Sequence, residues 1–385
     1  MYQFEFYMPT KVLFGAGQLN NLHAEKMPGK KALIVTSNGS STKKFGYLKR
    51  VEEQLDKAKV EHILFDEVRA NPTDKNVMDG AKKIRENNCD FVVALGGGSV
   101  MDAAKCIALM AVNDGDIWEY VSTIGGNRKN FEKNAIPLIA ITTSAGTGSE
   151  VDAFSVISND ATQEKSGMLS TFPVISIVDS DLMMSVPKKL TAYQGMDAFF
   201  HAAESVICKN EHPMGEMFAL KAIELVAKYL PIAYKNGEDK EARAYMALAN
   251  SLAGFYMLCT SQHRMEHVMG GYHSNLEHGA GLIMLSHAYF DFFAEKKAAE
   301  VQMIKMAKAM GIENPTSGKD FIKALDKLIS EVGCENLKMS DYGITKEELK
   351  KYPQRIHEVH GGDINADPVK LSDEDYLKIF EAAYK

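Results

Sequence analysis

The chain has 385 residues, of which 45% are hydrophobic and 25% are charged, as is usual for a globular protein. Its net charge of −7 argues against nucleic acid or an anionic membrane surface as the main partner, because both require concentrated positive charge. The length exceeds what one ordinary core needs and predicts two domains.

The five cysteines are far apart and never form a C-x-x-C pair, which indicates neither a disulfide framework nor a thiolate metal site. The N-terminus lacks a basic segment followed by an apolar run, and no stretch approaches about 18 consecutive apolar residues. We therefore expect a cytoplasmic protein without membrane-spanning segments.

From Lys31 to about Asp179, short β-branched runs alternate with amphipathic segments whose apolar residues recur at helical spacing. This pattern predicts a mainly parallel sheet covered by helices on both faces. The expected strands are 31–36, 61–66, 90–96, 136–143 and 174–179, and the expected helices between them are 43–58, 74–87 and 99–113.

After Pro187 the strand pattern ends and helix-forming segments dominate. The expected helices are 191–207, 214–234, 241–259 and a capped C-terminal helix at 372–385. The sequence therefore predicts an α/β domain of residues 1–182 and an all-α domain of residues 183–385.

A glycine-rich turn joins one expected strand to the next helix in DFVVALGGGSVMDAAK. Gly97 and Gly98 allow close backbone approach, and the N-terminus of a helix that opens at Ser99 favours a phosphate. Ser99 and Asp102 also match the S-x-x-D capping box, which is a structural alternative for both residues. The spacing matches neither GxxxxGK[ST] nor GxGxxG, which argues against an ATP-hydrolysing P-loop.

A second loop, ITTSAGTGSE, follows the expected strand 136–143 and is rich in hydroxyl groups and glycine. Such a loop suits a polyphosphate or a ribose, and the structural alternative is an ordinary Ser/Thr turn. Two loops of this kind after parallel strands predict a nucleotide site. The polar residues of the second loop are Thr142, Thr143, Ser144, Thr147 and Ser149.

The end of the first expected strand indicates which dinucleotide is bound. A dinucleotide fold meets the adenosine ribose there, and an acidic residue at this point binds the 2′-hydroxyl of NAD and repels a 2′-phosphate. This chain has no acidic residue at Ser37, Asn38, Gly39 or Ser40. NADP(H) is therefore favoured over NAD(H), the alternative being that the small polar loop is simply a good turn.

Seven of the eleven histidines lie in one part of the helical half. Asp197 with His201, and His263 with His267, are each four residues apart and share a helix face, and His278 follows in another segment. A single such pair is more often a surface interaction, but several converging segments favour a metal site. One carboxylate with several imidazoles suits Zn or Fe(II) better than Ca or Mg. The remaining histidines of this region, His212, His273 and His287, are expected to be structural.

Eight short motifs occur in order along nearly the whole chain: FGAG, NPT, GGGSVMDAAK, TTSAGTGSE, VDSDLM, GMDAFFHAAE, HRMEH and EHGAG. Together they resemble the iron-containing, or group III, alcohol dehydrogenase family. The resemblance implies a Rossmann-like, dinucleotide-binding N-terminal domain and an all-α, metal-binding C-terminal domain in a dehydroquinate synthase-like architecture. It also implies a homodimer.

The resemblance implies roles for individual residues as well. His267 matches a histidine that lies near the nicotinamide and is not a ligand. The family's metal ligands fall on Asp197, His201, His263 and His278. Its cofactor contacts fall on Gly97, Gly98, Ser99, Asp102, Thr142, Thr143, Thr147, Ser149 and Lys165, with Asn71 nearby. For Lys165, the alternative is a solvated surface lysine.

Two features depart from the family pattern. His263 and His278 are one residue further apart than the family pattern has them, and Glu277 stands where a proline is frequent. The longer loop makes His273 an alternative to His278 as the last ligand, although the EHGAG motif favours His278.

Three functions are compatible with these features. The favoured one is a metal-dependent oxidoreductase that interconverts a small primary or secondary alcohol and its aldehyde or ketone with NAD(P)(H), with His267 relaying the proton. A lyase of the dehydroquinate synthase type, which uses NAD transiently, keeps the same architecture. A non-catalytic nucleotide-binding protein with a structural metal ranks last, because a cage without cysteine looks like an open catalytic site.

Overall fold

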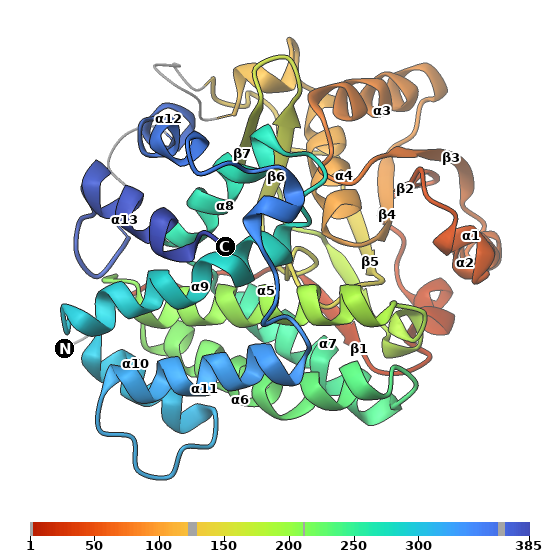
Figure 1. The fold of residues 1–385 in the computed structure, drawn as a ribbon. Helices are drawn as coiled ribbons and strands as arrows, with labels where there is room; N and C mark the ends of the chain where they lie inside the picture. Colours follow the sequence, from red (N-terminus) through yellow and green to blue (C-terminus); the bar gives the residue numbers. More distant parts are fainter. Residues whose placement is uncertain (1–2, 122–128, 211, 361–365) are drawn as a thin grey trace. The chain divides into compact units, whose positions relative to one another are not determined.

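The computed structural model describes residues 3–121, 129–210, 212–360 and 366–385 (Figure 1). The chain divides into two compact units, one made of most of residues 7–186 and the other of Pro187–Lys385 together with the N-terminal residues up to Phe6. The first unit holds a parallel sheet and the second is helical, so the predicted fold class is confirmed.

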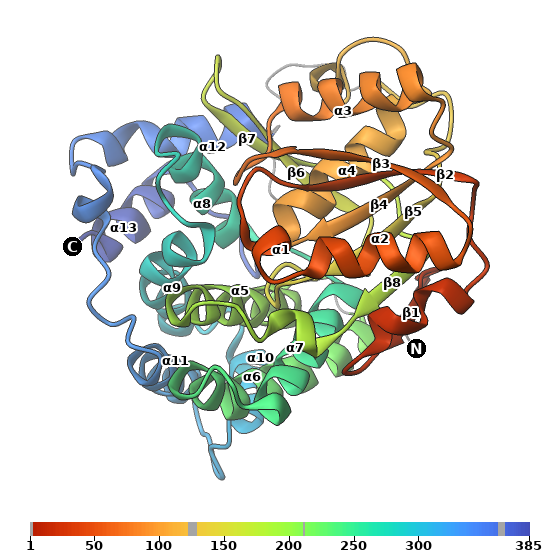
Figure 2. The ribbon, with the colours of Figure 1, turned by 90° about the vertical axis from the view of Figure 1, so that its right-hand side faces the viewer.

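The first unit is built around a six-stranded parallel sheet (Figure 2). The strand order is β1-β8-β5-β4-β2-β3, and every neighbouring pair is parallel. In that order the strands are β1 (Lys11–Phe14), β8 (Ile175–Val178), β5 (Leu138–Thr142), β4 (Phe91–Gly96), β2 (Lys31–Ser37) and β3 (Glu61–Val68).

The central strands are apolar on both faces because each face carries its own core. In β2, Ile34 belongs to the core that includes α2 (Tyr47–Lys57), and Val35 belongs to the core that includes α3 (Asp74–Asn87) and α4 (Gly98–Met110). Successive strand residues point to opposite faces, so a continuous apolar run is what a sheet covered on both sides requires. A short helix, α1 (Ser41–Lys44), precedes α2.

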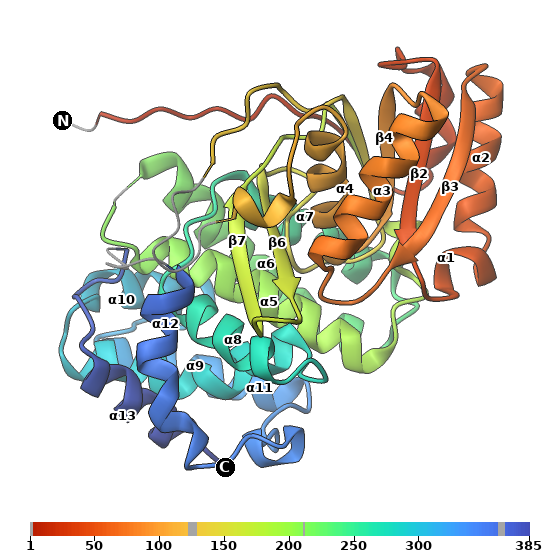
Figure 3. The ribbon, with the colours of Figure 1, turned by 90° about the horizontal axis from the view of Figure 1, so that it is seen from above.

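Three described strands are absent from the prediction: β1, β6 (Phe154–Asn159) and β7 (Glu164–Leu169). The last two form an antiparallel hairpin (Figure 3). Their many polar residues hide the alternation that predicts a strand, yet Lys165 in β7 is buried. Tertiary partners, which a local pattern cannot reveal, satisfy these polar groups.

The first unit extends to Val186, beyond the predicted boundary at residue 182. The reason is Asp179, which caps the 3₁₀ helix Ser180–Met183 and belongs to the sheet unit. Its carboxylate also accepts hydrogen bonds from the backbone N–H groups of Gly17 at 2.8 Å and Leu19 at 3.1 Å, which ties this segment to the unit.

The N-terminal residues up to Phe6 group with the helical unit, although the prediction assigned them to the first domain. The backbone oxygen of Glu5 lies 3.2 Å from His212 Nε2, and the Phe4 ring packs edge-on against the His212 ring. These contacts explain the assignment.

The second unit contains helices joined by loops, and it has no strand among its described residues. Its helices are α5 (Lys188–Ile207), α6 (Pro213–Lys235), α7 (Lys240–Phe255), α8 (Ser261–Tyr272), α9 (His278–Glu295), α10 (Glu300–Ala309), α11 (Gly318–Glu331), α12 (Tyr352–His360) and α13 (Asp373–Ala383). Helix α5 lies among α6, α7 and α9 (Figure 1) and packs against all three, and most of its residues are buried. None of the helices in the described ranges is long and apolar enough to cross a membrane.

Glycines let the helices approach closely around α5. A Cβ at Gly195 in α5 would lie 2.3 Å from the Leu230 side chain, and one at Gly279 in α9 would lie 2.3 Å from the backbone oxygen of Tyr193. The second contact brings the first turn of α9, which begins with His278, directly against α5.

Candidate metal centre and nucleotide loops

Three helices bring one carboxylate and three imidazoles together in the helical unit. Asp197 and His201 lie one turn apart on α5, His263 lies on α8, and His278 begins α9. Asp197 Oδ1 is 3.6 Å from His201 Nδ1, 3.5 Å from His263 Nε2 and 3.5 Å from His278 Nε2. Two ligand atoms that are each about 2.1 Å from a tetrahedral metal lie about 3.4 Å apart, so these separations suit a metal cage.

The centre of this cluster lacks the hydrogen bonds that buried polar atoms normally make. Asp197 Oδ1 and His263 Nε2 are buried, and neither has a hydrogen-bond partner among the described residues. Leaving both atoms unpaired is costly, and a cation between them removes that cost. The donor set therefore fits a divalent metal ion.

The pKa shifts in the cluster also favour a bound cation. Burial by itself raises the pKa of Asp197, but the neighbouring His201 and His278 imidazoles lower it by more, to well below its ordinary value. Burial lowers the pKa of His263, but Cys259 and Glu204 raise it well above its ordinary value. The site therefore favours positive charge, either as protons or as a metal cation.

Two buried glutamates orient the imidazoles from behind. Glu204 Oε1 accepts a hydrogen bond from His263 Nδ1, and Glu266 Oε2 accepts one from His278 Nδ1. Both carboxylates are fully buried. Each bond fixes the ring so that Nε2 faces Asp197, as outer carboxylates do for metal-binding histidines.

Both glutamates are missing from the predicted site. Glu204 lies seven residues after Asp197 on the same face of α5, and Glu266 lies three residues after His263 on α8. This helical spacing is a sequence signal for them.

Cys259 is a further residue absent from the prediction, which indicated no thiolate at the metal site. Cys259, His201 and His263 each offer a ligand atom within 4.8 Å of the other two. Burial raises the pKa of the Cys259 thiol, but the adjacent His263 and His201 lower it by more, to about 7. Its spacing of four residues before His263 is the signal that the prediction overlooked.

His267 lies one turn after His263 on α8. It is absent from the group of Asp197, His263 and His278, but one ligand atom each from His267, Glu266 and His278 lies within 4.8 Å of the other two. Its ring centroid is 5.6 Å from that of His278 and 5.6 Å from that of His360 on α12. Burial lowers the pKa of His360 to about 3, so this neighbour is neutral. His267 thus lies beside the cage, next to the neutral imidazole of His360.

The histidines that the sequence treats as structural are engaged elsewhere. His212 Nδ1 accepts a hydrogen bond from Gly215 N at 3.0 Å and caps α6. His273 Nε2 lies 3.0 Å from Glu348, and His287 Nδ1 lies 2.8 Å from Asp326. The structure thus brings His278, and not His273, to Asp197.

In the sheet unit, the predicted nucleotide loops meet at the carboxyl ends of β4 and β5. A Cβ at Gly97 would lie 3.0 Å from Ser144 Oγ, and one at Gly98 would lie 2.4 Å from the Thr147 side chain. Thr143 N donates to Gly96 O at 3.0 Å. Gly97 and Gly98 are therefore required by the packing of the second loop against the first, because a side chain at either position would crowd that loop. Their lack of a side chain also leaves room for a phosphate to approach the backbone.

Asp102 does not form the predicted capping box with Ser99. The N-cap of α4 is Gly97, with no side-chain hydrogen bond, so the helix opens one residue earlier than predicted. Instead, Asp102 Oδ1 accepts from Ser149 Oγ at 2.7 Å and Oδ2 accepts from Val156 N at 2.8 Å. The capping-box alternative is wrong, because tertiary donors bind this carboxylate.

Lys105, one turn after Asp102, is fully buried and is also absent from the prediction. Its ammonium group donates to Ser149 Oγ at 2.8 Å, Asp152 Oδ1 at 2.7 Å and Phe154 O at 2.9 Å. This network fixes the second loop and the start of β6 to α4. A lysine among the small apolar residues of a buried helix is the signal for it.

The other predicted cofactor residues surround these loops. Ser37 is the last residue of β2, and Asn38 to Ser40 follow it at the same sheet edge, where Asn38 N donates to Val68 O at 2.8 Å. Asn71 adopts a left-handed conformation with φ 53° just before Pro72, whose oxygen accepts from Ser158 N at 2.8 Å. Ser158 pairs with Lys165 in the β6–β7 hairpin, so Asn71 and Lys165 flank one strand.

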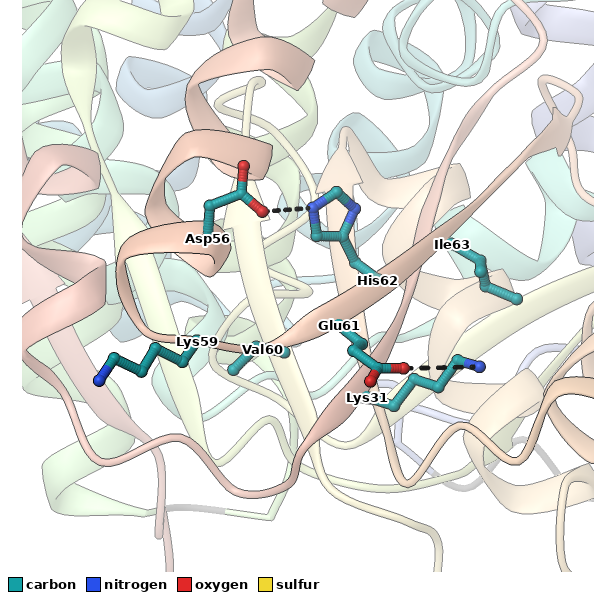
Figure 4. Close-up of a pocket in the computed structure, with 7 residues that line it drawn as sticks. All are labelled: Lys31, Asp56, Lys59, Val60, Glu61, His62 and Ile63. Atoms are coloured by element: carbon teal, nitrogen blue, oxygen red, sulfur yellow. Dashed lines mark hydrogen bonds and ion pairs between the residues drawn. The ribbon is translucent and has the colours of Figure 1, made fainter.

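A hollow at the opposite end of β3 is lined by Lys31, Asp56, Glu61 and His62, among others (Figure 4). Its charges are paired: His62 Nε2 lies 3.2 Å from Asp56, and Lys31 Nζ lies 3.9 Å from Glu61. It includes none of the predicted site residues and has no cluster of candidate ligands.

Two family models match the chain, one for each half. A model of iron-containing alcohol dehydrogenases matches residues 9–180, and a model of the C-terminal region of the Fe-containing alcohol dehydrogenase family matches residues 191–384. Alcohol dehydrogenase 4 of Saccharomyces cerevisiae is 33% identical, over 99% of this chain and 98% of that protein.

Two further relatives support the same comparison. The NADPH-dependent butanol dehydrogenase of Clostridium saccharobutylicum is 32% identical, over 98% of this chain and 97% of that protein. The crystal structure of an archaeal halo-thermophilic Red Sea brine pool alcohol dehydrogenase matches with a TM-score of 0.93 and 32% identity, over 100% of this chain and 99% of that one.

Proposed function

Because this chain belongs to the iron-containing alcohol dehydrogenase family, we propose that it interconverts a small alcohol and its aldehyde or ketone with a nicotinamide cofactor. The alcohol gives a hydride to the oxidised cofactor and a proton to solvent, and the reverse reaction takes up both. The observation that carries this proposal is the position of Asp197 Oδ1, 3.5–3.6 Å from nitrogens of His201, His263 and His278.

The metal ion that these four residues would hold is Fe(II) or Zn(II), since one carboxylate and three imidazoles suit both. When bound, such an ion supplies Lewis-acid polarisation of a substrate oxygen. Asp197 offsets part of the metal charge, and Glu204 and Glu266 hold the His263 and His278 rings in orientation.

We assign His267 to the proton path. It lies beside the cage without belonging to the Asp197 group, and an imidazole exchanges protons near neutral pH. Because His360 is kept neutral by burial, it does not repel a proton on His267.

We propose NADP(H) as the preferred cofactor. The loop at 37–40 has no carboxylate, and Asp66 on the neighbouring strand β3 is paired with Lys43. A 2′-phosphate therefore meets no negative charge within the loop itself. The glycine and hydroxyl loops after β4 and β5 would bind the rest of the dinucleotide.

Two alternative functions are less well supported: a lyase of the dehydroquinate synthase type, and a non-catalytic nucleotide-binding protein with a structural metal. The family match across both halves favours net oxidation and reduction over a lyase, and the outer carboxylates behind the imidazoles are what a tuned catalytic metal needs.

We also propose a homodimer in the cytoplasm. Strand β1 lies at an edge of the sheet, with one side unpaired and Phe14 exposed, which offers a surface to a second copy. All five cysteines are free thiols, as a reducing compartment requires. Light scattering of the purified protein tests the assembly.

The function is tested on the purified full chain. Metal content is measured first, and a panel of short-chain aldehydes is then assayed with NADPH and with NADH, before and after chelation. We expect reductase activity with NADPH that is lost on chelation and returns when Fe(II) or Zn(II) is added. Activity that survives complete metal removal would contradict the proposal.

A further inference from the structure

Cys259 gives the metal centre a sulfur donor that the cage of one carboxylate and three imidazoles lacks. It lies in the segment between α7 and α8, next to Thr260, the N-cap of α8. One ligand atom each from Cys259, His201 and His263 lies within 4.8 Å of the other two. This is a compact group of one thiol and two imidazoles.

A lone cysteine is not a site, but a second observation points to a ligand here. His263 is 98% buried, and its Nε2 has no hydrogen-bond partner among the described residues. His263 also belongs to two of the three groups of potential ligands in the described part of the chain, the one with Asp197 and His278 and the one with His201 and Cys259. A cation near His263 can therefore take its other ligands either from Asp197 and His278 or from His201 and Cys259.

The two groups differ in chemical softness. Asp197 with imidazoles suits Fe(II) and other borderline or harder ions, whereas a thiolate with imidazoles selects thiophilic ions such as Zn(II), Co(II) and Cd(II). We propose that Cys259 is the ligand of a second coordination position, overlapping the cage, in which thiophilic divalent ions bind His201, Cys259 and His263.

This inference rests on the proposed metal cage, because both positions share His201 and His263. Binding forms one sulfur–metal bond, and the thiol proton goes to solvent; no electron is transferred. A thiophilic ion would therefore bind on the Cys259 side of His263, and a harder ion would bind on the Asp197 side. In this way Cys259 would determine which divalent ions the protein prefers.

Cobalt titration of the full chain tests the proposal. The protein is freed of metal by chelation and titrated with Co(II), whose visible absorption reports binding and whose near-ultraviolet thiolate-to-cobalt band reports a sulfur ligand. We compare the wild type with Cys259→Ser and with Cys208→Ser, a matched control at the C-terminal end of α5.

We expect the wild type and Cys208→Ser to show both absorptions, and Cys259→Ser to keep the visible absorption and lose the thiolate band. Cys259→Ser should also lower Cd(II) affinity by at least the roughly 10–100-fold that loss of an outer-shell partner costs, and leave Mn(II) affinity unchanged. Visible absorption without the thiolate band in the wild type would overturn the inference and leave the cage intact. No cobalt binding at all would overturn the cage.

A second measurement uses the wild-type protein alone, so its result does not depend on whether Cys259→Ser folds. The wild type is alkylated with and without Cd(II), and the labelled peptides are identified by mass spectrometry. We expect Cd(II) to protect Cys259 and Mn(II) not to protect it. Equal labelling of Cys259 in the presence and absence of Cd(II) would contradict the proposal.

Discussion

We expect cofactor choice to depend on Gly39, a residue with little structural constraint. It lies in the exposed loop after β2, its φ is not in the left-handed region, and a Cβ there would meet Ser37 Oγ at 3.5 Å, which is ordinary contact. A larger side chain at this position therefore fits without strain, so its effect on cofactor binding can be attributed to charge.

The first prediction follows. Gly39→Asp should lower kcat/KM for NADPH by roughly 10–1,000-fold, because a like charge beside the 2′-phosphate costs a few kcal/mol, and should spare or improve NADH use. The neutral control Gly39→Asn should change both far less. Steady-state kinetics with both cofactors measure this, and an equal loss for NADPH in both variants would show that charge is not the cause.

Asp102 gives a prediction about pH. Burial raises its pKa to about 6, although Lys105 and the hydrogen bonds from Ser149 and Val156 oppose the shift. The folded protein thus binds this proton more tightly than the unfolded chain does. The stability that Asp102 contributes is therefore fully present below its ordinary pKa and is lost as the pH rises through about 6.

The second prediction is that Asp102→Asn, which is neutral at every pH, gains stability relative to the wild type as the pH rises from about 4 to about 6, by on the order of 2–3 kcal/mol, and keeps this gain at higher pH. Urea unfolding at pH values below and above this range measures the difference. The control is Asp66→Asn, because a hydrogen bond from Lys43 lowers the Asp66 pKa, so its contribution changes only below its ordinary pKa and should stay constant over this range. The same trend in both variants would contradict the assignment.

At the scale of elements, the start of α8 is held by carboxylates from distant parts of the chain. Thr260 makes no side-chain cap, but its N–H donates to Glu204 at 2.6 Å. Ser261 N donates to Asp367 Oδ1 at 3.0 Å, and Tyr289 OH donates to the same oxygen at 2.7 Å. The segment before α13 thus braces the helix that carries His263.

The third prediction concerns this brace. Asp367→Ala leaves the buried Ser261 N–H without its acceptor and removes one of the two acceptors of the Tyr289 hydroxyl. We therefore expect a loss of roughly 2–4 kcal/mol in the free energy of unfolding and weaker metal binding through His263. Urea unfolding and cobalt titration measure both effects. The exposed Asp341→Ala is the control. Unchanged metal affinity in Asp367→Ala would show that the brace serves folding alone.

At the scale of the whole molecule, we expect the metal and the nucleotide cofactor to stabilise different units. The candidate ligands Asp197, His201, His263 and His278 all belong to the helical unit, whereas the nucleotide loops all belong to the sheet unit. A ligand that binds the folded state stabilises the unit that holds it.

The fourth prediction is that metal at about 100 times its Kd stabilises the helical unit by about 2.7 kcal/mol, and that NADPH stabilises the sheet unit instead. Hydrogen exchange of the full chain, with each ligand added separately, locates the protection. In Asp197→Asn the metal effect should disappear while the NADPH effect remains. If added metal slowed hydrogen exchange only in the sheet unit, the assignment of the metal site to the helical unit would be wrong.

The sequence by itself determined the fold class and brought out most of the candidate site. Strand and helix periods are local properties, so the continuous apolar run of β2 and the period of α3, which spans 74–87 as predicted, were readable without a structure. Pairs on one helix, such as Asp197 with His201, were readable for the same reason, although their role as ligands stays a prediction.

Tertiary structure alone decided what each polar group contacts. Glu204, Cys259 and Lys105 have only weak signals in the sequence, and their partners became known when helices and loops distant in sequence met around them. It also decided that Asp102 binds Ser149 and Val156 rather than capping α4, and that Asp179 keeps the chain up to Val186 in the sheet unit. The physical reason is that a buried polar side chain takes the partner that the fold presents, and that partner is set by packing over long range.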